Sequence, residues 1–331
     1  MADSSLNLTG WELEQIEKSY LVQRSWIQTT GSAPATTKSD LEQLRLAGVD
    51  VAWDRVPCTA ALVIPGRLGA VEHQNPAQVP PYVPAFLAYR EAPLVRSLVL
   101  RHRQDLDVLL VDGNGILHPR RFGLASAIGV ECGVRTIGVA KTYHWFANTL
   151  QGHRAPCIPA LAALVASQNS PVTGTWQGRM LYPSERDIRH VMQVEQLTVL
   201  PLCMRWRPCD AKARDALSQR LGNGNPGESS LYVDEVLGAA VRTGKRAVNP
   251  IYVSIGHGID LSRAVALVYA AAREHRLPEP LRMADQLARG TLASSEASSQ
   301  PPKLEISSSF WYLEGNPHAQ RQRSPDESYS S

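Results

Sequence analysis

The stretch Val108-Leu109-Leu110-Val111-Asp112-Gly113-Asn114-Gly115 decides the fold. Four successive apolar residues are typical of a strand that is buried on both faces, as the strands of a parallel sheet are. Asp112 ends this strand, and ligands of open α/β sheets bind beyond the carboxyl ends of such strands. Asp112 is therefore a candidate site residue, and the alternative is an Asp-Gly pair that only forms a turn.

Strand and helix patterns alternate on both sides of this central strand. The other predicted strands span 44–53, 57–65, 68–73, 134–139 and 251–255. The predicted helices span about 9–28, 87–99, 120–132 and the residues that follow the capping residue Asp260. A hairpin meander followed by strand–helix–strand units predicts an α/β fold with a mixed sheet flanked by helices.

Composition limits the classes of protein that this chain can be. The 331 residues are 44% hydrophobic, which is enough for a sizeable core, and no apolar run is long enough to span a bilayer. The start of the chain lacks the pattern of a signal peptide, and the five cysteines form no CxxC pair, so an intracellular location in cytoplasm or nucleus is expected. The net charge of +3 permits a nucleic-acid partner only through a local basic patch.

The chain is expected to form one large domain and a tail. The domain covers 1–290 and includes an insertion at about 145–230, which we expect to be irregular because it is rich in Pro, Gly, Gln and Arg. Residues 291–331 are rich in Ser, Gln and Pro and are expected to be disordered. No Walker loop, HExxH or GxSxG motif is present, which argues against several common enzyme classes.

Asp50 lies in a strand whose other members are mostly apolar. The alternation of side chains places it on the same face as Gly48 and Ala52. These two small neighbours leave room beside the carboxylate for an ion and a ligand. The alternative is an aspartate on an edge strand that faces water.

Glu91 falls on the core-facing stripe of the helix that contains Leu87 and Leu94. An uncompensated carboxylate there costs on the order of several kcal/mol, so a nearby cation is expected. The alternative is a helix that begins at Pro93, with Glu91 near its N-terminus as an ordinary partner of the helix dipole.

Three carboxylates that converge on one sheet would hold one or two hard divalent cations, and Mg²⁺ prefers such oxygen ligands. His257 follows a strand directly and is a candidate ligand or proton carrier, as is His118; the alternative for either is an exposed loop histidine. Lys141 follows the strand over 134–139 and can neutralise a phosphate, or it can simply be solvated.

Five motifs in the same order resemble the endonuclease V family. They are Gly48-Val49-Asp50-Val51, Pro81-Tyr82-Val83-Pro84-Ala85-Phe86-Leu87-Ala88-Tyr89-Arg90-Glu91, Asp112-Gly113-Asn114-Gly115-Ile116-Leu117-His118-Pro119-Arg120-Arg121-Phe122-Gly123-Leu124-Ala125, Gly138-Val139-Ala140-Lys141 and Ser254-Ile255-Gly256-His257. Leu277-Pro278-Glu279-Pro280 also fits, and the resemblance covers roughly 40–145 and 230–287.

The resemblance implies a ribonuclease H-like fold and an endonuclease that depends on Mg²⁺, with Mn²⁺ as a possible substitute. Such enzymes hydrolyse the second phosphodiester bond 3′ to inosine in RNA or deoxyinosine in DNA and leave a 3′-hydroxyl and a 5′-phosphate. The extra segments of this chain favour RNA, although the motifs do not decide between the two nucleic acids.

The resemblance also assigns roles to residues. The metal and catalytic centre would consist of Asp50, Glu91, Asp112 and His257, with Lys141 at the reacting phosphate. The nucleic-acid contacts would come from a wedge of Pro81, Tyr82, Val83 and Pro84, and from His118, Arg120 and Lys141. The pocket for the flipped base would be lined by Ala85, Leu87, Gly113, Leu124 and Gly138.

Two positions depart from the family pattern. Ala85 stands where the family usually has glycine, which would strain the backbone if φ is positive there. Gly258 stands where a basic residue is common, which removes a possible phosphate contact. These departures keep open two other functions: a catalytically impaired protein that binds inosine-containing nucleic acid, or a related ribonuclease H-like nuclease with another substrate.

Overall fold

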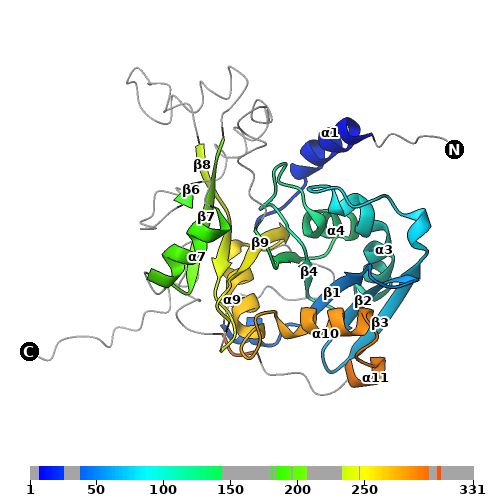
Figure 1. Ribbon diagram of the computed structural model, residues 1–331. Coiled ribbons are helices and arrows are strands. Elements are labelled where there is room, and N and C mark those ends of the chain that lie inside the picture. The colour runs from blue at the N-terminus through cyan, green and yellow to red at the C-terminus, as the bar shows by residue number, and fades with distance from the viewer. Residues whose placement is uncertain are drawn as a thin grey trace, which may run out of the picture.

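The computed structural model describes most of the chain (Figure 1). The described residues are 7–25, 38–143, 180–181, 184–194, 197–206, 233–245, 247–297 and 304–306. Within them a mixed sheet forms the centre of the molecule, and helices cover both of its faces. Among the helices of these residues, none combines the length and apolar character needed to cross a bilayer.

The sheet has nine strands in the order β3-β2-β1-β4-β5-β9-β8-β7-β6. Their bounds are β1 Leu46–Ala52, β2 Cys58–Ile64, β3 Leu68–Gln74, β4 Val108–Asp112, β5 Thr136–Ala140, β6 Met180–Leu181, β7 Val199–Trp206, β8 Val233–Val241 and β9 Ile251–His257. β1, β4 and β5 are parallel to one another, whereas β2, β3, β9, β8 and β7 continue the sheet through antiparallel pairs. The carboxyl ends of β1, β4 and β5 therefore lie next to one another at the same end of these three strands.

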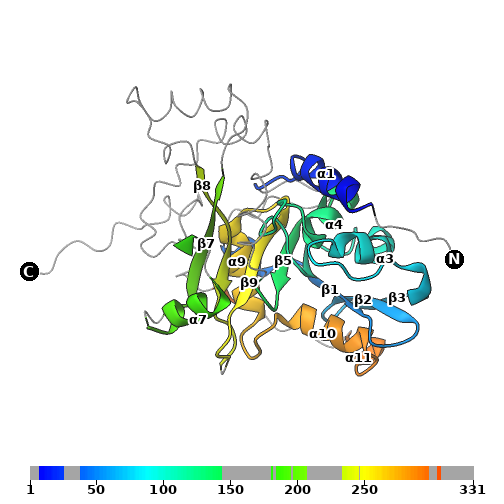
Figure 2. The same ribbon diagram turned by 45° about the horizontal axis from the view of Figure 1, so that its top comes forward.

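The helices are short and lie mainly against this sheet. Their bounds are α1 Leu8–Ser19, α2 Lys38–Glu42, α3 Leu87–His102, α4 Leu124–Cys132, α7 Glu185–Val194, α9 Leu261–Ala271, α10 Glu279–Ala288 and α11 Ser294–Ala297. A 3₁₀ helix, η1, spans Pro76–Gln78. Figure 2 shows α3 and α4 on one side of β1 and β2, and α10 and α11 on the other.

The two faces of β1 have different partners. Ala47 and Val49 belong to the main core, which also contains the apolar side chains of α3. On the opposite face, Ala52 packs against the Met283 and Ala284 side of α10. This second cluster is small, and it fixes α10 across the strand that carries Asp50.

The predicted mixed α/β architecture is confirmed, and the six predicted strands, which are β1 to β5 and β9, lie within one or two residues of their expected bounds. The strands β6, β7 and β8 were not predicted. Asp260 caps α9 as expected, because its Oδ1 accepts a hydrogen bond from the Arg263 backbone N–H at 2.9 Å. The first helix is shorter than expected and ends at Ser19. The alternative in which a helix begins at Pro93 is wrong, because α3 begins at Leu87 and continues through the proline.

The insertion at about 145–230 is not irregular throughout. Its described part contains α7, whose Ile188 and Met192 are buried, and β7, which extends the sheet by pairing with β8. The apolar spacing of α7 was overlooked because polar residues surround it. The expected tail begins with described residues that include the short helix α11, so disorder from residue 291 is not what the structure shows. Most of the rest of the insertion, and residues 298–303 and 307–331 of the tail, lie outside the described residues.

Gly48 is the residue on which the contact between β1 and α10 depends. A Cβ added there would lie 2.3 Å from the backbone carbon of Pro280 and 2.6 Å from the backbone nitrogen of Leu281. The space beside Asp50 that the small Gly48 was expected to leave for a ligand is therefore filled by the start of α10.

We predict that Gly48→Ala lowers the free energy of unfolding by about 2 to 3 kcal/mol, because backbone atoms cannot move aside as a flexible side chain can. Urea denaturation followed by circular dichroism measures the change. Gly133→Asn is the matched control, because a Cβ there meets nothing within 4 Å and asparagine tolerates the φ of 65° at this helix end. Equal stability of Gly48→Ala and the native chain would contradict the proposed packing.

Candidate active site

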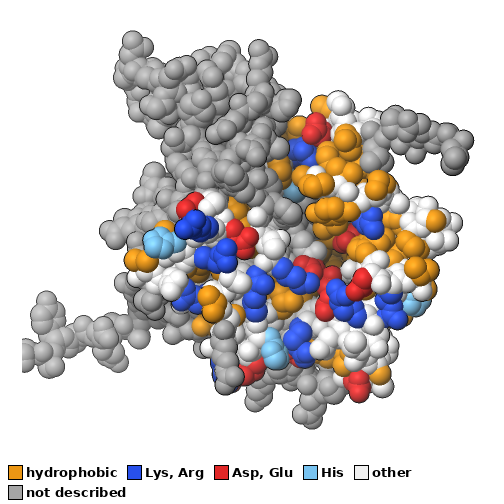
Figure 3. Space-filling view, in the orientation of Figure 1, with side chains coloured by type: hydrophobic (Ala, Val, Ile, Leu, Met, Phe, Trp, Pro, Cys, Tyr) orange, Lys and Arg blue, Asp and Glu red, His pale blue; other side chains and the backbone are white. Residues whose placement is uncertain are grey.

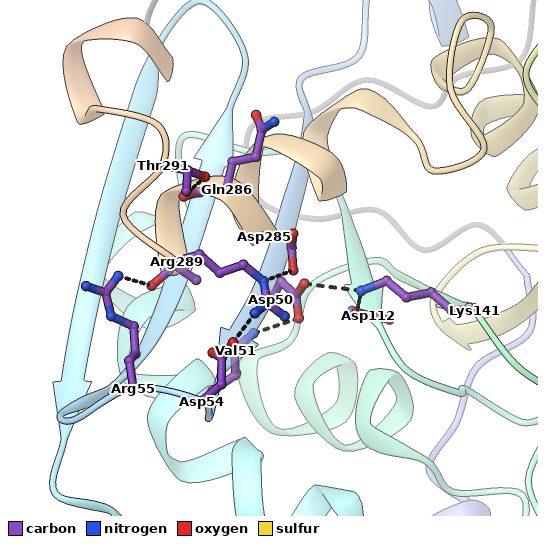
Figure 4. Close-up of polar contacts among 11 residues, drawn as sticks. Asp50, Val51, Asp54, Arg55, Asp112, Lys141, Asp285, Gln286, Arg289 and Thr291 are labelled. Carbon is purple, nitrogen blue, oxygen red and sulfur yellow. Dashed lines mark hydrogen bonds and ion pairs between the residues drawn. The ribbon is translucent and has the colours of Figure 1, made fainter.

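Asp50, Asp112 and Lys141 meet at the shared edge of the parallel strands (Figure 4). Val49 pairs with Val111, so Asp50 and Asp112 lie side by side on one face of the sheet, Asp112 at the end of β4 and Asp50 two residues before the end of β1. The Lys141 Nζ lies 2.5 Å from the Asp112 Oδ2 and 3.6 Å from the Asp50 Oδ2. The structure thus brings together the two carboxylates on which the sequence prediction depended.

Asp285 is a further acidic residue of this site that the sequence analysis missed. It lies on α10, and its negative charge acts on both Asp50 and Lys141. Arg289, one turn later, contacts the Asp285 Oδ1 through its Nε at 2.9 Å and also pairs with Asp54. A signal was present, since Asp285 follows the Leu277-Pro278-Glu279-Pro280 motif by five residues.

The charge of this cluster is unbalanced. Burial raises the pKa of Asp50 well above its usual value, and the charges of Asp112 and Asp285 raise it further. Burial alone would lower the pKa of Lys141, but Asp112 and Asp50 raise it above its ordinary value. Arg289 is paired with Asp285, so the ammonium of Lys141 is left to face the two carboxylates of Asp50 and Asp112, and additional positive charge would stabilise this ionised pair.

The donor set fits a hard divalent cation. Carboxylate oxygens are the ligands that such cations prefer, and Lys141 already occupies a cationic position between Asp50 and Asp112. Within the described residues, no three acidic or histidine side chains stand at the spacing of a formed metal site. A cation would therefore have to take the place that the ammonium now holds.

Glu91 is buried as predicted, and its carboxylate has a specific partner. The Trp53 indole Nε1 donates a hydrogen bond to the Glu91 Oε1 at 2.6 Å, and the Arg90 guanidinium lies 3.8 Å from the centroid of the same indole ring. Burial raises the pKa of Glu91 to about 8, and the charge of Asp112 contributes to this rise. The influence of Asp112 places Glu91 at the margin of the cluster.

His257 does not join the acidic cluster, which corrects the sequence prediction. Because β9 is antiparallel to β5, His257 pairs with Thr136 at the start of β5, three residues before the Val139 that pairs with Asp112. Three residues of strand span about 10 Å. The imidazole Nδ1 instead accepts a hydrogen bond from the Gln23 backbone N–H at 3.3 Å, and burial lowers its pKa, which favours the neutral ring.

The residues predicted to line a base pocket lie close to one another. A Cβ added to Gly113 would lie 3.4 Å from the Leu124 Cβ and 3.7 Å from the Leu87 Cδ2, and a Cβ on Gly138 would lie 2.7 Å from the Gly113 carbonyl oxygen. Gly113 has a φ of 149°, which favours glycine. Leucine side chains and exposed backbone thus gather next to Asp112.

Ala85 is at the centre of a hydrogen-bond network beside these residues. Its carbonyl oxygen accepts from the Gln15 Nε2 at 3.3 Å, the His118 Nε2 at 2.9 Å and an Arg120 terminal nitrogen at 2.9 Å. The Arg120 Nε also donates to the Gln15 Oε1 at 2.6 Å. Gln15 was not singled out by the sequence analysis, because a glutamine on an amphipathic helix carries no specific signal.

This network corrects the expected roles of His118 and Arg120. Both side chains are buried, and both donate to the Ala85 carbonyl rather than face a bound strand. In this structure they hold the loop before α3 in place. The wedge residues of that loop are different: Pro81, Tyr82 and Pro84 are exposed, and 53% of the Tyr82 surface is accessible.

The mixed sheet, its flanking helices and the acidic side chains at the ends of β1 and β4 define a nuclease of the ribonuclease H-like fold. A sequence profile described as Endonuclease V matches residues 31–177 and 213–286. Endonuclease V of Nocardia farcinica is 31% identical over 259 residues, which are 76% of this chain and 82% of the relative. The chain belongs to the Endonuclease V family and is an endonuclease that hydrolyses phosphodiester bonds.

Solved structures agree with this assignment. The catalytic domain of human Endonuclease V is 28% identical, with a TM-score of 0.56 that covers 87% of this chain and 96% of that structure. Endonuclease V of Ciona intestinalis in complex with an inosine-containing 24mer DNA shares the fold at 22% identity, with a TM-score of 0.55 over 86% of this chain and 97% of that one.

The first prediction from this site concerns Glu91. Its folded pKa of about 8 exceeds its ordinary value of 4.5, so the metal-free native state binds a proton that the unfolded chain releases, and stability falls as pH rises from 4.5 to 8. We predict that Glu91→Gln gains stability relative to the native chain between pH 5 and pH 8. Thermal denaturation in chelator measures this difference, with the exposed Glu17→Gln as control. Parallel curves for the native chain and Glu91→Gln would contradict the assignment.

The second prediction concerns Ala85, which has a φ of 67°. The left-handed region strains alanine, so the concern raised by the missing glycine is confirmed for the backbone. We predict that Ala85→Gly raises the free energy of unfolding by about 0.5 to 1 kcal/mol, because relief of strain outweighs the added freedom of the unfolded chain. Ala88→Gly, in the first turns of α3, should instead lower it by about 1 kcal/mol. Chemical denaturation that shows both changes with the same sign would contradict this view.

Proposed function

We propose that this endonuclease requires Mg²⁺, or Mn²⁺ in its place, and cuts the second phosphodiester bond 3′ to inosine in RNA or deoxyinosine in DNA. The products would be a 3′-hydroxyl and a 5′-phosphate. The observation that carries this proposal is the pair of partly buried carboxylates, Asp50 and Asp112, held beside Lys141 near the carboxyl ends of the parallel strands. The Ciona intestinalis relative in complex with inosine-containing DNA supports the choice of substrate.

The reaction needs a nucleophile and a stabilised leaving group. Bound to Asp50 and Asp112, with Glu91 and Asp285 nearby, a divalent cation would supply Lewis acidity and an activated water. Lys141 would then be released from its carboxylate partners and could neutralise the charge that develops on the phosphate. Before the cation binds, the surrounding carboxylates raise the pKa of Lys141, which favours the protonated ammonium.

Selection of the base would depend on the pocket beside Asp112. The exposed Tyr82, between prolines, would enter the stack of bases and help to displace the target nucleotide. The leucine side chains of Leu87 and Leu124 offer an apolar surface. The Gly113 N–H donates to the Val139 carbonyl, so the Gly113 carbonyl would be the backbone group offered to a flipped base. The network on the Ala85 carbonyl would hold the pocket and the wedge in a fixed relation.

The alternative function is binding of inosine-containing nucleic acid without efficient cleavage. The observation that favours it is the strained backbone at Ala85, next to the pocket. The missing basic residue at Gly258 gives it less support, because that position has a φ of 69° and its N–H donates to the Gln23 carbonyl, away from the acidic cluster.

We predict that the purified chain with Mg²⁺ cuts end-labelled single strands with one inosine, in RNA and in DNA, and leaves matched guanosine strands intact. Asp50→Asn and Asp112→Asn should each reduce the rate by about 100-fold or more, since a buried electrostatic contribution to the transition state is lost. Asp105→Asn is the control, because this exposed carboxylate lies beyond the other end of α3.

Product mobility against a size ladder identifies the bond that is cut. Failure to cut either strand, under conditions in which a relative such as human Endonuclease V cuts, would contradict the proposed activity. Inosine-selective binding without products would then support the alternative function.

A further inference from the structure

Helix α7 lies in a part of the chain that the family profile does not match. The matched ranges end at residue 177 and resume at residue 213, and α7 spans Glu185–Val194 between them. The helix is nevertheless anchored, because Ile188 and Met192 are buried and α7 packs against the added strand β7. It is therefore a feature of this chain with a defined place beside the sheet.

The outer face of α7 carries its basic side chains. Arg186, Arg189 and His190 are exposed, and their spacing of three and four residues places them on one side of the helix. The exposed Asp187 stands beside Arg186 in the first turn and accepts a hydrogen bond from the hydroxyl of Ser184 at 2.6 Å. The solvent side of the helix therefore carries two arginines, with one carboxylate next to Arg186 and, among the described residues, none that pairs with Arg189.

A chain of hydrogen bonds links α7 to the active site. An Arg189 terminal nitrogen donates to the Asn249 Oδ1 at 3.2 Å, and the Arg276 Nε donates to the Asn249 carbonyl at 3.2 Å. Arg276 also donates to the carbonyl of Lys141, whose ammonium contacts Asp112. Asn249 thus joins Arg189 on α7 to Arg276, the arginine whose side chain contacts the Lys141 backbone.

The two sides of the site differ in how their arginines are neutralised. On the α10 side, Arg289 is paired with the carboxylates of Asp285 and Asp54. On the α7 side, the hydrogen bonds seen among the described residues join Arg189 and Arg276 to neutral acceptors only. Their positive charge remains available to an anion, and a guanidinium held in place suits a phosphate.

The surface that joins these groups is continuous. Figure 3 shows Lys and Arg side chains, with Asp and Glu side chains among them, in a band across the face that carries α7 and α10. A single-stranded nucleic acid whose scissile phosphate lies at Lys141 has flanking phosphates that must cross this face in one direction or the other. The side without carboxylate partners is the one that attracts them.

We propose that α7 extends the substrate path of this endonuclease, with Arg186 and Arg189 binding backbone phosphates of the strand that flanks the scissile bond. The proposal rests on the proposed function for the position of that bond. Because phosphate contacts carry no base information, α7 contributes affinity and salt dependence and leaves the preference for inosine to the pocket.

The test compares the native chain with the double variant Arg186→Ala/Arg189→Ala. Fluorescence anisotropy measures binding of a labelled single strand with one inosine in chelator, across a series of salt concentrations. Loss of two phosphate contacts should weaken binding and reduce the slope of log affinity against log salt by about 1.4 for a single strand. The single-turnover cleavage rate at limiting protein and Mg²⁺ should fall in proportion to the loss of affinity, because Lys141 and the carboxylates are intact.

The matched control is Arg67→Ala/Arg103→Ala, which removes the same charge from exposed positions at the opposite edge of the sheet. The labelled nucleic acid is also shortened from its 5′ or its 3′ end. Shortening from one end should remove the difference in affinity between the native chain and the α7 variant, and shortening from the other end should leave that difference unchanged. An unchanged salt slope, or an equal loss in the control, would overturn the proposal.

The outcome is separable from that of the proposed function. Binding of a guanosine-containing strand reports the same salt slope, so failure of the native chain to cut would contradict the activity and leave this comparison intact. A chain that cuts normally, with a double variant that binds as tightly as the native chain at every salt concentration, would overturn only the role of α7. Binding of acidic protein partners in place of nucleic acid would also count against it.

Discussion

Repulsion among carboxylates at the end of two parallel strands is the constraint on which the rest of this structure depends. Asp50 and Asp112 are forced together because β1 and β4 are neighbours with the same direction. Asp285 adds a third negative charge from α10, which Arg289 pairs with, while Lys141 is shared between Asp50 and Asp112. Such a site costs stability as it stands, and it is useful only if a cation and a phosphate bring the missing balance of charge.

Some of the residues around the cluster are fixed by hydrogen bonds, and others are exposed to solvent. The Ala85 carbonyl oxygen accepts hydrogen bonds from three side chains, and these bonds fix the loop between the exposed wedge and α3. His118 and Arg120 are therefore structural in this chain, although their motif resembles one that touches nucleic acid. The open parts are the wedge and the basic side of α7, where side chains face solvent.

Most of the fold could be predicted from local patterns. The apolar run before Asp112, the alternation around Asp50 and the helical stripe with Glu91 correspond to β4, β1 and α3. The position of His257 could not be predicted, because it depends on the direction of β9 relative to β5. Asp285 was missed for a similar reason. A polar residue on an amphipathic helix indicates a site only when the element that packs against the helix is known, and here that element is β1.

The sequence by itself determined the order of the elements from β1 to β5, the burial of Glu91 and the family to which the motifs belong, because these follow from spacing along the chain. The tertiary structure alone decided which charged groups share space. It brought Asp285 to Asp50 by packing α10 over Gly48. It also placed His257 next to the start of β5, at the opposite end of that strand from the acidic cluster. Electrostatic interactions depend on the distance between charges in space. Strand direction and helix packing set that distance, and the local sequence pattern does not predict them.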